Sequence, residues 1–239
     1  MNENMKKATI EEIRERFDKD VERFTDLSTG QLSTVDAILS LELITESAKR
    51  IRPQAKNILD IGCGAGNYTL KMLTKLPDLS CTLLDLSQPM LDKAYERVSS
   101  VTSGEINIIQ SDLRDVDLQT NHYDIILAGA VLHHLRDDSD WESVFTKLFK
   151  ALVPGGCLLI SDLIRQDSEI LNTYFWEKYG DYLESVGGKD FKSTIFEYIE
   201  LEDTPRSLFY QLDLMKKVGF KNMEILHKNS CFAAFGGIK

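Results

Sequence analysis

Hydrophobic residues recur at helical spacing through the first fifty positions of the chain. Residues 8–24 are dense in mixed charge and carry an apolar residue every three or four positions, namely Ile10, Ile13, Phe17, Val21 and Phe24. This spacing places the apolar side chains on one face of a helix. A second run of the same period extends from Leu32 towards Arg52 and is closed by Pro53. The pattern therefore predicts N-terminal helices over residues 1–54.

After Pro53, short apolar runs alternate with longer amphipathic ones. The short runs predict strands over 57–61, 81–85, 106–110, 123–128 and 157–162, and the longer runs predict helices over about 66–76, 89–99 and 139–152. Ser87 is the expected N-cap of the helix that contains Pro89. The segment Pro154-Gly155-Gly156 predicts a sharp stop before the strand at 157–162. Such alternation calls for a parallel sheet covered on both faces.

The pattern changes again in the last third of the chain. Residues 168–219 are typical of helices and carry many aromatic side chains, among them Trp176, Tyr179 and Tyr198. Two strand-like segments, 220–227 and 231–236, follow with only three residues between them. This short separation predicts an antiparallel hairpin.

Composition limits the classes of function that need to be considered. Lys and Arg total 28 against 38 Asp and Glu, a formal net charge of -10, which opposes a broad nucleic-acid surface because such surfaces rest on clustered cations. No apolar run approaches the roughly 20 residues that span a bilayer. The N-terminal segment MNENMKKATI lacks the apolar stretch of a signal peptide. We therefore expect a cytoplasmic protein that binds neither nucleic acid nor membrane, and a homodimer remains open.

The cysteines do not indicate a disulfide framework or a zinc site. Cys81, Cys157 and Cys231 lie in apolar runs that are typical of buried strands, and Cys63 lies in a glycine-rich segment. All four stand far apart and form no CxxC pair. We expect no bound metal.

The glycine-rich segment runs from Asp60 to Gly66 and follows the first predicted strand directly. Glycine suits this corner because the backbone must turn tightly and a ligand must approach without a Cβ in the way. The next helix presents free N–H groups and the positive end of its dipole. The carboxyl end of a parallel strand is the expected ligand crevice. The segment alone predicts a nucleotide-type site.

A second acid and the spacing of the glycines narrow the ligand. Asp85 ends the second predicted strand, 19 residues after Gly66, where a carboxylate can accept both ribose hydroxyls of an adenosine. The dinucleotide fingerprint G-x-G-x-x-G would need glycine where the chain has Asn67. The observed G-x-G-x-G follows an acid, Asp60, that would repel a pyrophosphate but could hold an ammonium group. The local chemistry favours a nucleoside that carries an amino acid over NAD.

These segments together resemble the successive motifs of class I S-adenosylmethionine-dependent methyltransferases. The resemblance covers roughly residues 55–162, in family order, and rests on five segments: 60–66, Asp85, 111–113, 128–135 and 152–156. It implies S-adenosylmethionine as cofactor. It also implies a binding role for each matching residue. The methionine part would contact Asp60, Gly62, Cys63, Gly64 and Gly66; the ribose and adenine would contact Asp85, Leu86, Asp112 and Leu113; and Ala128 would line the wall near the sulfonium.

The resemblance also sets the expected fold. We expect an α/β protein with a Rossmann-like, doubly wound, mostly parallel seven-stranded sheet, a C-terminal antiparallel hairpin and helical cap elements. The whole chain, 1–239, would form one such domain. Its parts would be N-terminal helices over 1–54, a cofactor-binding core over 55–162, a helical cap and last core helix over 163–219, and the hairpin over 220–239.

Methyl transfer from a sulfonium is an in-line displacement of an already activated group. The protein must mainly align the reactants and exclude water, and a general base is needed only when the nucleophile arrives protonated. His133 and His134, which follow the fourth predicted strand, are the candidate base or orienting residues. A His pair at this place is often structural in the resembling family. Adjacent histidines rarely reach one metal ion together, and the sequence indicates no third ligand.

The substrate side of the site is less defined by sequence. In the resembling family, an insertion after the fifth strand and the N-terminal helices cover the substrate, so Trp176, Tyr179 and Tyr198 are candidates for its pocket. Packing within a helical cap explains the same aromatic residues. Arg165 and Arg206 could bind an acidic substrate or could simply be solvated. The expected acceptor of the methyl group is a small molecule.

Three other functions remain as alternatives. The terminal segment Met215–Phe220 is similar to that of carboxy-S-adenosylmethionine synthase, a family that remodels the cofactor itself and holds the extra carboxylate with an arginine. The matching place here is Leu214, with no arginine adjacent. A non-catalytic cofactor-binding protein would keep the glycine segment and block the substrate mouth. An NAD-dependent dehydrogenase is disfavoured by Asn67.

Overall fold

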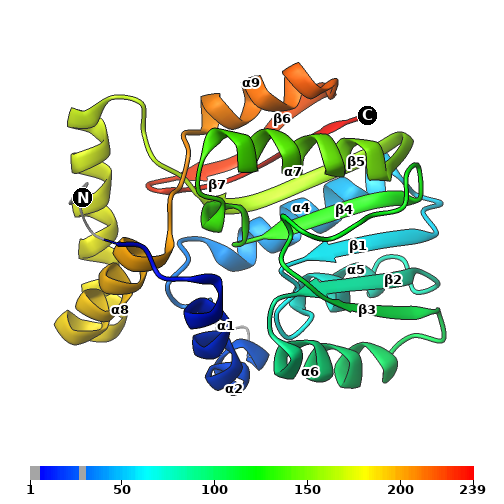
Figure 1. Ribbon diagram of the computed structural model, residues 1–239, viewed down its shortest axis with the longest axis horizontal. Helices are drawn as coiled ribbons and strands as arrows, with labels where there is room; N and C mark the ends of the chain where they lie inside the picture. The colour runs from blue at the N-terminus through cyan, green and yellow to red at the C-terminus, as the bar shows by residue number, and fades with distance from the viewer. Residues whose placement is uncertain (1–5, 27–30) are drawn as a thin grey trace.

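The computed structural model describes residues 6–26 and 31–239, and one mixed sheet dominates the described part (Figure 1). Residues 1–5 lie outside the described residues. They begin the N-terminal segment in which we expect no signal peptide. The sheet has seven strands in the order β3-β2-β1-β4-β5-β7-β6. Their bounds are β1 (Asn57–Ile61), β2 (Ser80–Asp85), β3 (Ile106–Gln110), β4 (Tyr123–Gly129), β5 (Leu152–Leu163), β6 (Lys221–Asn229) and β7 (Phe232–Ile238).

Strand direction follows the alternation of the sequence. The pairs β1–β2, β2–β3, β1–β4 and β4–β5 are parallel, whereas β7 runs antiparallel to both β5 and β6. The strand order reverses between β1 and β4. From β1 the chain continues to β2 and β3 on one side of the sheet, whereas β4 and β5 lie on the other side. In such doubly wound sheets, the crevice outside the carboxyl ends at this point is where ligands bind. The expected Rossmann-like fold with a C-terminal antiparallel hairpin is confirmed.

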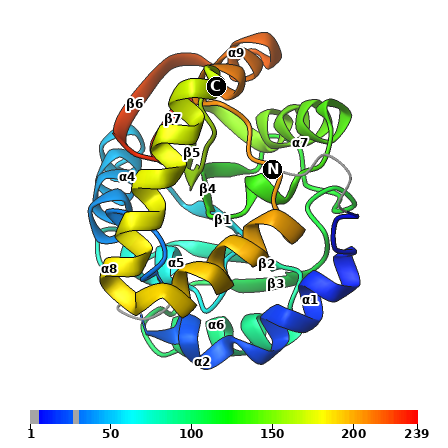
Figure 2. The same cartoon turned by 90° about the vertical axis from the view of Figure 1, so that its left-hand side faces the viewer.

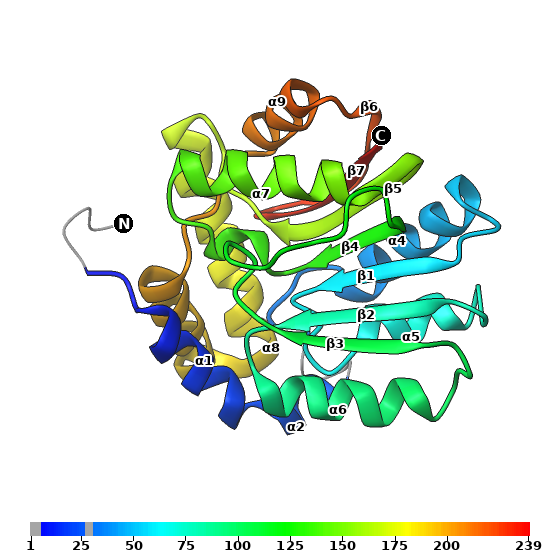
Figure 3. The same cartoon turned by 45° about the vertical axis from the view of Figure 1, so that its right-hand side comes forward.

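Helices cover both faces of the sheet and also its carboxyl edge (Figures 1 and 3). They are α1 (Ile10–Lys19), α2 (Val21–Thr25), α4 (Ala37–Ile51), α5 (Asn67–Leu73), α6 (Gln88–Ser99), α7 (Asp138–Ala151), α8 (Glu169–Glu202) and α9 (Leu208–Val218), with a short 3-10 turn, η1, at Leu132–His134. Ser87 caps α6 as expected, because its hydroxyl accepts a hydrogen bond from the Met90 N–H. No described helix is long and apolar enough to cross a membrane.

Two buried apolar layers fix the sheet between its helices. Along β1, Ile58 faces one layer, with α4, α5 and α6, while Leu59 faces the other, with α7 and α9. Trp141 and Phe145 of α7 are fully buried in the second layer. Alternate residues of a strand point to opposite faces, so a central strand with helices on both sides must be apolar at nearly every position. This explains the continuous apolar runs in the sequence.

The structure departs from the sequence expectations at three element boundaries. Pro154-Gly155-Gly156 does not stop the chain before a strand, because β5 already begins at Leu152 and includes these residues. The pairing of β5 with β4 shifts register between Tyr123 and Ile125, and Gly155 has a φ of +77° there. The expected helix over 8–24 is broken at Asp20 into α1 and α2, and α4 begins only after Asp36, whose φ is +54°.

The helical cap lies across the carboxyl edge of the sheet. Figure 2 looks onto this edge and shows α1, α2 and the two halves of α8 in front of the strands. The halves of α8 meet at Gly188, whose φ of +81° is outside the helical region. Tyr179 and Leu183 of α8 are buried in a third apolar cluster with Phe232 of β7. The predicted helical cap is therefore packed onto the end of the sheet.

Candidate functional site

A cavity of about 280 Å³ lies between the carboxyl edge of the sheet and the cap. The loops that follow β1, β2, β3, β4 and β5 form its floor, and α1 and α8 form much of its opposite wall. It coincides with the point at which the strand order reverses, where an open α/β sheet binds its ligand.

The glycine segment forms a cradle at the floor of this cavity. Gly62, Gly64 and Gly66 have φ values of +63°, +51° and +82°, a region that other residues rarely adopt. A Cβ at Gly64 would meet no atom within 4 Å, so this position opens into free space, whereas a Cβ at Gly62 would lie 2.6 Å from Val131. Gly64 and Cys63 both line the cavity. The backbone here is open to close approach by a ligand.

Asp85 joins the first two loops of the floor. Its Oδ2 accepts a hydrogen bond from the Gly64 N–H at 2.8 Å, and its Oδ1 accepts one from the Ser87 N–H at 2.9 Å. Burial raises the pKa of Asp85 above its ordinary value, although the hydrogen bonds from Ser87 and Gly64 oppose this. Each carboxylate oxygen keeps a further lone pair for a ligand hydroxyl. Asp85 and Leu86 line the cavity together.

Asp60 occupies a different place from the one expected. Its Oδ2 accepts hydrogen bonds from the N–H and the hydroxyl of Thr69, at 3.1 and 2.7 Å. Burial raises the pKa of Asp60 to about 7, against the two Thr69 hydrogen bonds. Among the described residues that line the cavity, Asp60 is absent. The carboxylate ties the end of β1 to α5 and acts behind the glycine cradle.

Ala128 also lies outside the described cavity lining. It is paired within the sheet with Ile61 on one side and Ile160 on the other. The next residues along the chain, Gly129 and Ala130, line the cavity in its place. The strand therefore continues one residue further than predicted, and the wall is built from the turn that follows.

Asp112 lines the cavity, but its carboxylate is already engaged. The Arg114 side chain contacts it through two nitrogens, with Nε 2.8 Å from Oδ1 and Nη2 2.7 Å from Oδ2. Burial opposes ionisation, yet the hydrogen bonds and charge of Arg114 hold the pKa of Asp112 below its ordinary value. Leu113 follows it as a buried apolar residue of the same wall. The pairing with Arg114 was not evident from the sequence.

His133 is held between two carboxylates. Its Nδ1 contacts Asp162, its backbone N–H donates to Asp162 at 3.1 Å, and its Nε2 lies 3.7 Å from Asp203. Burial lowers the pKa of His133, but the charges of Asp203 and Asp162 outweigh it and raise that pKa to about 9. His133 is therefore a charged, buried group at neutral pH.

His134 shares Asp203 with its neighbour. Its Nδ1 lies 3.1 Å from Asp203 Oδ1, and its ring stands edge-on to the ring of Phe17. Both histidines line the cavity. Burial opposes ionisation of Asp203, but the charge of His133 and the contact with His134 hold the pKa of Asp203 below its ordinary value.

Sequence reasoning missed the two acids of this cluster. Asp162 is the second-last residue of β5, at the carboxyl edge of the sheet, and this position near a strand end was a usable signal. Asp203 follows the end of α8, and nothing in its neighbourhood indicated a contact with residues 70 positions earlier. His133, His134 and Asp203 bring one ligand-type atom each within 4.8 Å of one another, so a third candidate ligand does exist among the described residues. We describe them as ion pairs, because each histidine contacts a carboxylate.

The cap supplies the upper wall of the cavity. Tyr179 and Tyr198 of α8 line it, as expected for a substrate pocket, together with Ile13 and Phe17 of α1. Trp176 is absent from the described lining and packs against Tyr179 and Phe196. For this residue, packing within the cap is the better interpretation. The two cap arginines considered from the sequence are paired elsewhere: Arg165 with Glu169 and Arg206 with Asp138.

Two side chains near the C-terminal end of helix α1 hold it across the cavity. Arg16 pairs with Glu202 at the end of α8, and the Asp18 carboxylate accepts from the Ser87 hydroxyl at 2.6 Å. These contacts connect the cap to the second loop of the floor. The cavity is therefore closed by segments that lie far apart in the sequence.

Comparison with known proteins agrees with this geometry. The family model of a methyltransferase domain matches residues 58–156. The chain is 24% identical over 235 residues to demethylmenaquinone methyltransferase of Listeria monocytogenes, covering 94% of this chain and 96% of the relative. It is 26% identical over 235 residues to carboxy-S-adenosyl-L-methionine synthase of Aliivibrio fischeri, covering 93% and 92%.

A solved structure shows the same fold. Human N-acetylserotonin methyltransferase in complex with S-adenosylmethionine superposes with a TM-score of 0.61 at 14% identity, covering 95% of this chain. The present chain spans only 56% of that protein's length. Sheet order, glycine cradle and sequence similarity together define a nucleoside-binding α/β enzyme. These similarities support a class I S-adenosylmethionine-dependent methyltransferase, with the methyltransferase domain matched over residues 58–156.

Proposed function

We propose that this enzyme methylates a small molecule held between the cofactor loops and the cap. The observation that carries the proposal is the continuity of the cavity. The glycine cradle and Asp85 line one part of it, and the aromatic side chains of α1 and α8 line another. A donor and a small acceptor can thus meet in one enclosed space, as in-line transfer requires.

The residues of the floor fit S-adenosylmethionine. Gly64 leaves free space where any other residue would place a Cβ, and Asp85 offers a carboxylate for the ribose. Leu86 and Leu113 would supply apolar surface for the adenine, and Asp112, held in place by Arg114, would accept a hydrogen bond from its amino group. Cys63, Gly62 and Gly66 shape the turn. Asp60 contributes indirectly, because it fixes α5 through Thr69.

S-adenosylmethionine supplies an activated methyl group, so the protein has to align an acceptor, exclude water and accept a proton where one is released. Between the two candidate histidines, the geometry favours His134 as the proton acceptor. His133 is already charged between Asp162 and Asp203 and has no capacity to take a further proton at neutral pH. The Oδ1 atom of Asp203 lies 3.1 Å from Nδ1 of His134, so its charge can stabilise the imidazolium that forms.

The relatives support a small acceptor. The Listeria relative is named for methylation of demethylmenaquinone, a small molecule, and aligns with almost the whole chain. The four free and buried cysteines agree with the reducing cytoplasm as the place of action.

A second candidate, remodelling of the cofactor, is favoured by the similarity to carboxy-S-adenosyl-L-methionine synthase. The structure gives this candidate less support. Leu214, at the place where that family has an arginine, is buried in the core between α9 and the sheet. It is absent from the described cavity lining, so no arginine from this position holds a carboxylate.

Calorimetric titration tests the proposal directly. We expect S-adenosylmethionine and S-adenosylhomocysteine to bind and NAD to give no heat above dilution. Tight binding of NAD without a response to either sulfur nucleoside would show that the proposal is wrong.

A further inference from the structure

The arginines that line the cavity are all neutralised by carboxylates of the chain. Arg16 makes a two-point contact with Glu202, with Nε 2.6 Å from Oε1 and Nη2 2.5 Å from Oε2. Its guanidinium lies 4.1 Å from the ring centre of Phe17 and 4.7 Å from that of Tyr198. Such a guanidinium is held on both its charged edge and its faces, and it has little capacity left for a ligand anion.

The other lining arginines are engaged in the same way. Arg114 pairs with Asp112 and also lies 3.4 Å from Asp140, and Arg23 lies 2.8 Å from Asp20. Within the described part of the chain, Lys and Arg side chains reach the cavity only at these three positions. A carboxylate or phosphate on the acceptor would find no unpaired Lys or Arg among the described residues of the lining.

Acids exceed arginines around the same space. Five carboxylates line the described cavity: Asp85, Asp112, Asp162, Glu202 and Asp203. Asp162 and Asp203 share one charged histidine, His133. A bound anion would therefore add repulsion in an enclosed, poorly screened site, where charge interactions are stronger than in water.

The remaining wall near the histidines is apolar. Ile13, Phe17, Ile195, Ile199 and Phe232 all line the cavity. Their surface suits a flat, apolar molecule, and aromatic side chains at this wall can stack with or stand edge-on to a ring. At this end His134 can accept a proton, and the positive charge of His133 is already shared by Asp162 and Asp203.

We infer that the acceptor is an uncharged, apolar aromatic molecule that presents a hydroxyl group to His134. This inference rests on the proposed methyl transfer. In the reaction, the hydroxyl oxygen forms the new bond to the methyl carbon and the carbon–sulfur bond breaks. The electron pair of the broken carbon–sulfur bond stays on sulfur, which leaves a neutral thioether. The hydroxyl proton passes to His134.

Three probes of matched shape test the charge of the acceptor: 2-naphthol, 2-naphthoate and 2-naphthylmethylammonium. Each is titrated calorimetrically into protein saturated with S-adenosylhomocysteine. We expect 2-naphthol to bind at least about tenfold more tightly than either charged probe, a difference of about 1.4 kcal/mol. Preference for a charged probe, or no binding of 2-naphthol, overturns the inference. Failure to bind S-adenosylhomocysteine at all would instead overturn the proposed function.

A substitution tests the role of the paired arginine. Glu202→Gln removes the charge that neutralises Arg16, so the affinity for 2-naphthoate should rise by about tenfold while that for 2-naphthol stays within about twofold. Glu197→Gln, on an exposed position of the same helix, is the matched control and should change neither affinity. An unchanged naphthoate affinity in a Glu202→Gln protein that still binds S-adenosylhomocysteine would contradict the pairing argument. The three-probe comparison on the wild type stands if this variant does not fold.

Discussion

At the scale of single residues, the two acids at the ends of β1 and β2 show how far sequence reasoning reaches. The sequence predicts a cofactor contact for both, Asp60 as a partner of the ammonium group and Asp85 as a partner of the ribose. The structure places Asp85 against the cavity and turns Asp60 towards Thr69, nine residues further along. Which neighbour captures a carboxylate depends on the helix that packs behind it, and a strand pattern does not contain that information.

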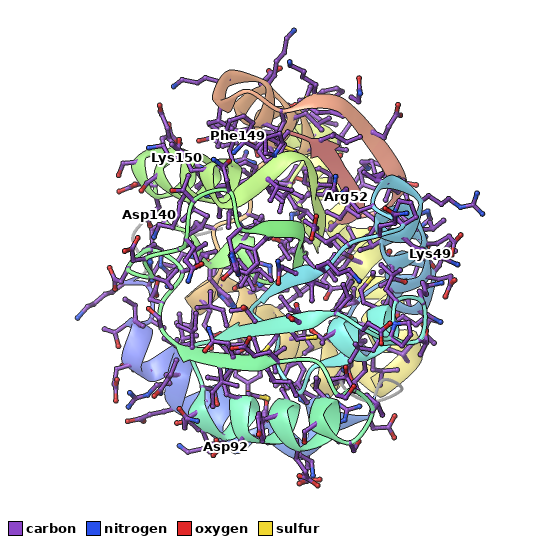
Figure 4. All side chains as sticks on the ribbon, turned by 90° about the vertical axis from the view of Figure 1, so that its right-hand side faces the viewer. Lys49, Arg52, Asp92, Asp140, Phe149 and Lys150 are labelled. Atoms are coloured by element: carbon purple, nitrogen blue, oxygen red, sulfur yellow. The ribbon has the colours of Figure 1, made fainter. Side chains whose placement is uncertain are left out.

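The first prediction concerns Asp85. Asp85→Asn should weaken S-adenosylhomocysteine binding by about 10- to 100-fold, because the ribose would lose hydrogen bonds to a charged acceptor. The free energy of unfolding should fall by about 1–3 kcal/mol, because the amide oxygen can accept from only one of the two backbone N–H groups and the NH2 group faces the other. Calorimetry measures the affinity. The control is Asp92→Asn on the outer side of α6 (Figure 4), which should bind as the wild type does. Equal affinities in both variants would refute the ribose role.

The second prediction concerns the buried acid. With a pKa of about 7 in the folded state against an ordinary 3.8, Asp60 binds a proton in the fold that it loses on unfolding. Its contribution to stability therefore falls as pH rises from about 4 to 7, by about 1.4 kcal/mol per pH unit. Asp60→Asn removes this dependence. Urea unfolding at pH 5 and pH 7.5 measures the free energy of unfolding. Relative to the wild type, the variant should be more stable at pH 7.5 than at pH 5. An identical difference at both values would contradict the assignment.

The third prediction concerns the charged histidine. His133 should remain doubly protonated at pH 8, because its folded pKa is raised to about 9. The stability that its ion pairs contribute is complete below pH 6.5 and is lost as pH rises through 9. Nitrogen-15 NMR of the imidazole rings measures the protonation directly. Asp162→Asn should make this ring neutral at pH 8, and a neutral His133 in the wild type at that pH would be evidence against the ion pairs.

At the scale of elements, most boundaries could be predicted because periodicity and capping are local. β1 and β3 match their predicted bounds, and Ser87 caps α6 as its sequence indicates. The segment at 152–156 could not be predicted in this way. Pro and Gly are common stop signals, but Leu152 pairs with Tyr123 and the strand passes through them with a shift of register. Pairing across the sheet overrides the local signal there.

The fourth prediction compares two glycines of the cradle. Gly64→Ala should cost only the strain of a positive φ, about 1 kcal/mol, since the new methyl meets no atom. It should nevertheless weaken S-adenosylhomocysteine binding, because the methyl projects into the cavity. Gly62→Ala adds an overlap with Val131 and should lose about 2–4 kcal/mol of unfolding free energy. Urea unfolding and calorimetry on both variants separate the two effects, and equal stability losses would be inconsistent with this geometry.

At the scale of the whole molecule, the cap completes the site by contacts over long separations. Arg16 and Glu202 are 186 positions apart, and His134 and Asp203 are 69 apart. The sequence predicted that helices cover the substrate, through resemblance to a family. It could not assign the acid beside His134, because that depends on how α8 bends and where it ends.

The fifth prediction tests the fastening of α1. Arg16→Met leaves Glu202 buried without its partner and should lower the local stability of the contact by about 3 kcal/mol. Hydrogen exchange of the amides of α1 should accelerate strongly, while those of β1 and β4 keep their protection. Arg14→Met is the control, since Arg14 pairs with Glu11 of the same helix. This ion pair lies within α1 and does not connect it to another element. Equal exchange in the two variants would count against a fastened cap.

The position of β7 has a consequence for how the protein is made. Of the seven strands of the described sheet, β7 is synthesised last, yet it lies inside the sheet, between β5 and β6. Until it emerges from the ribosome, β5 has an open edge and β6 has no neighbour to pair with. The growing chain must keep that edge from pairing with other chains. Completion of the sheet therefore waits until residues 232–238 have been synthesised. The same holds for the cluster in which Phe232 packs against Tyr179 of the cap.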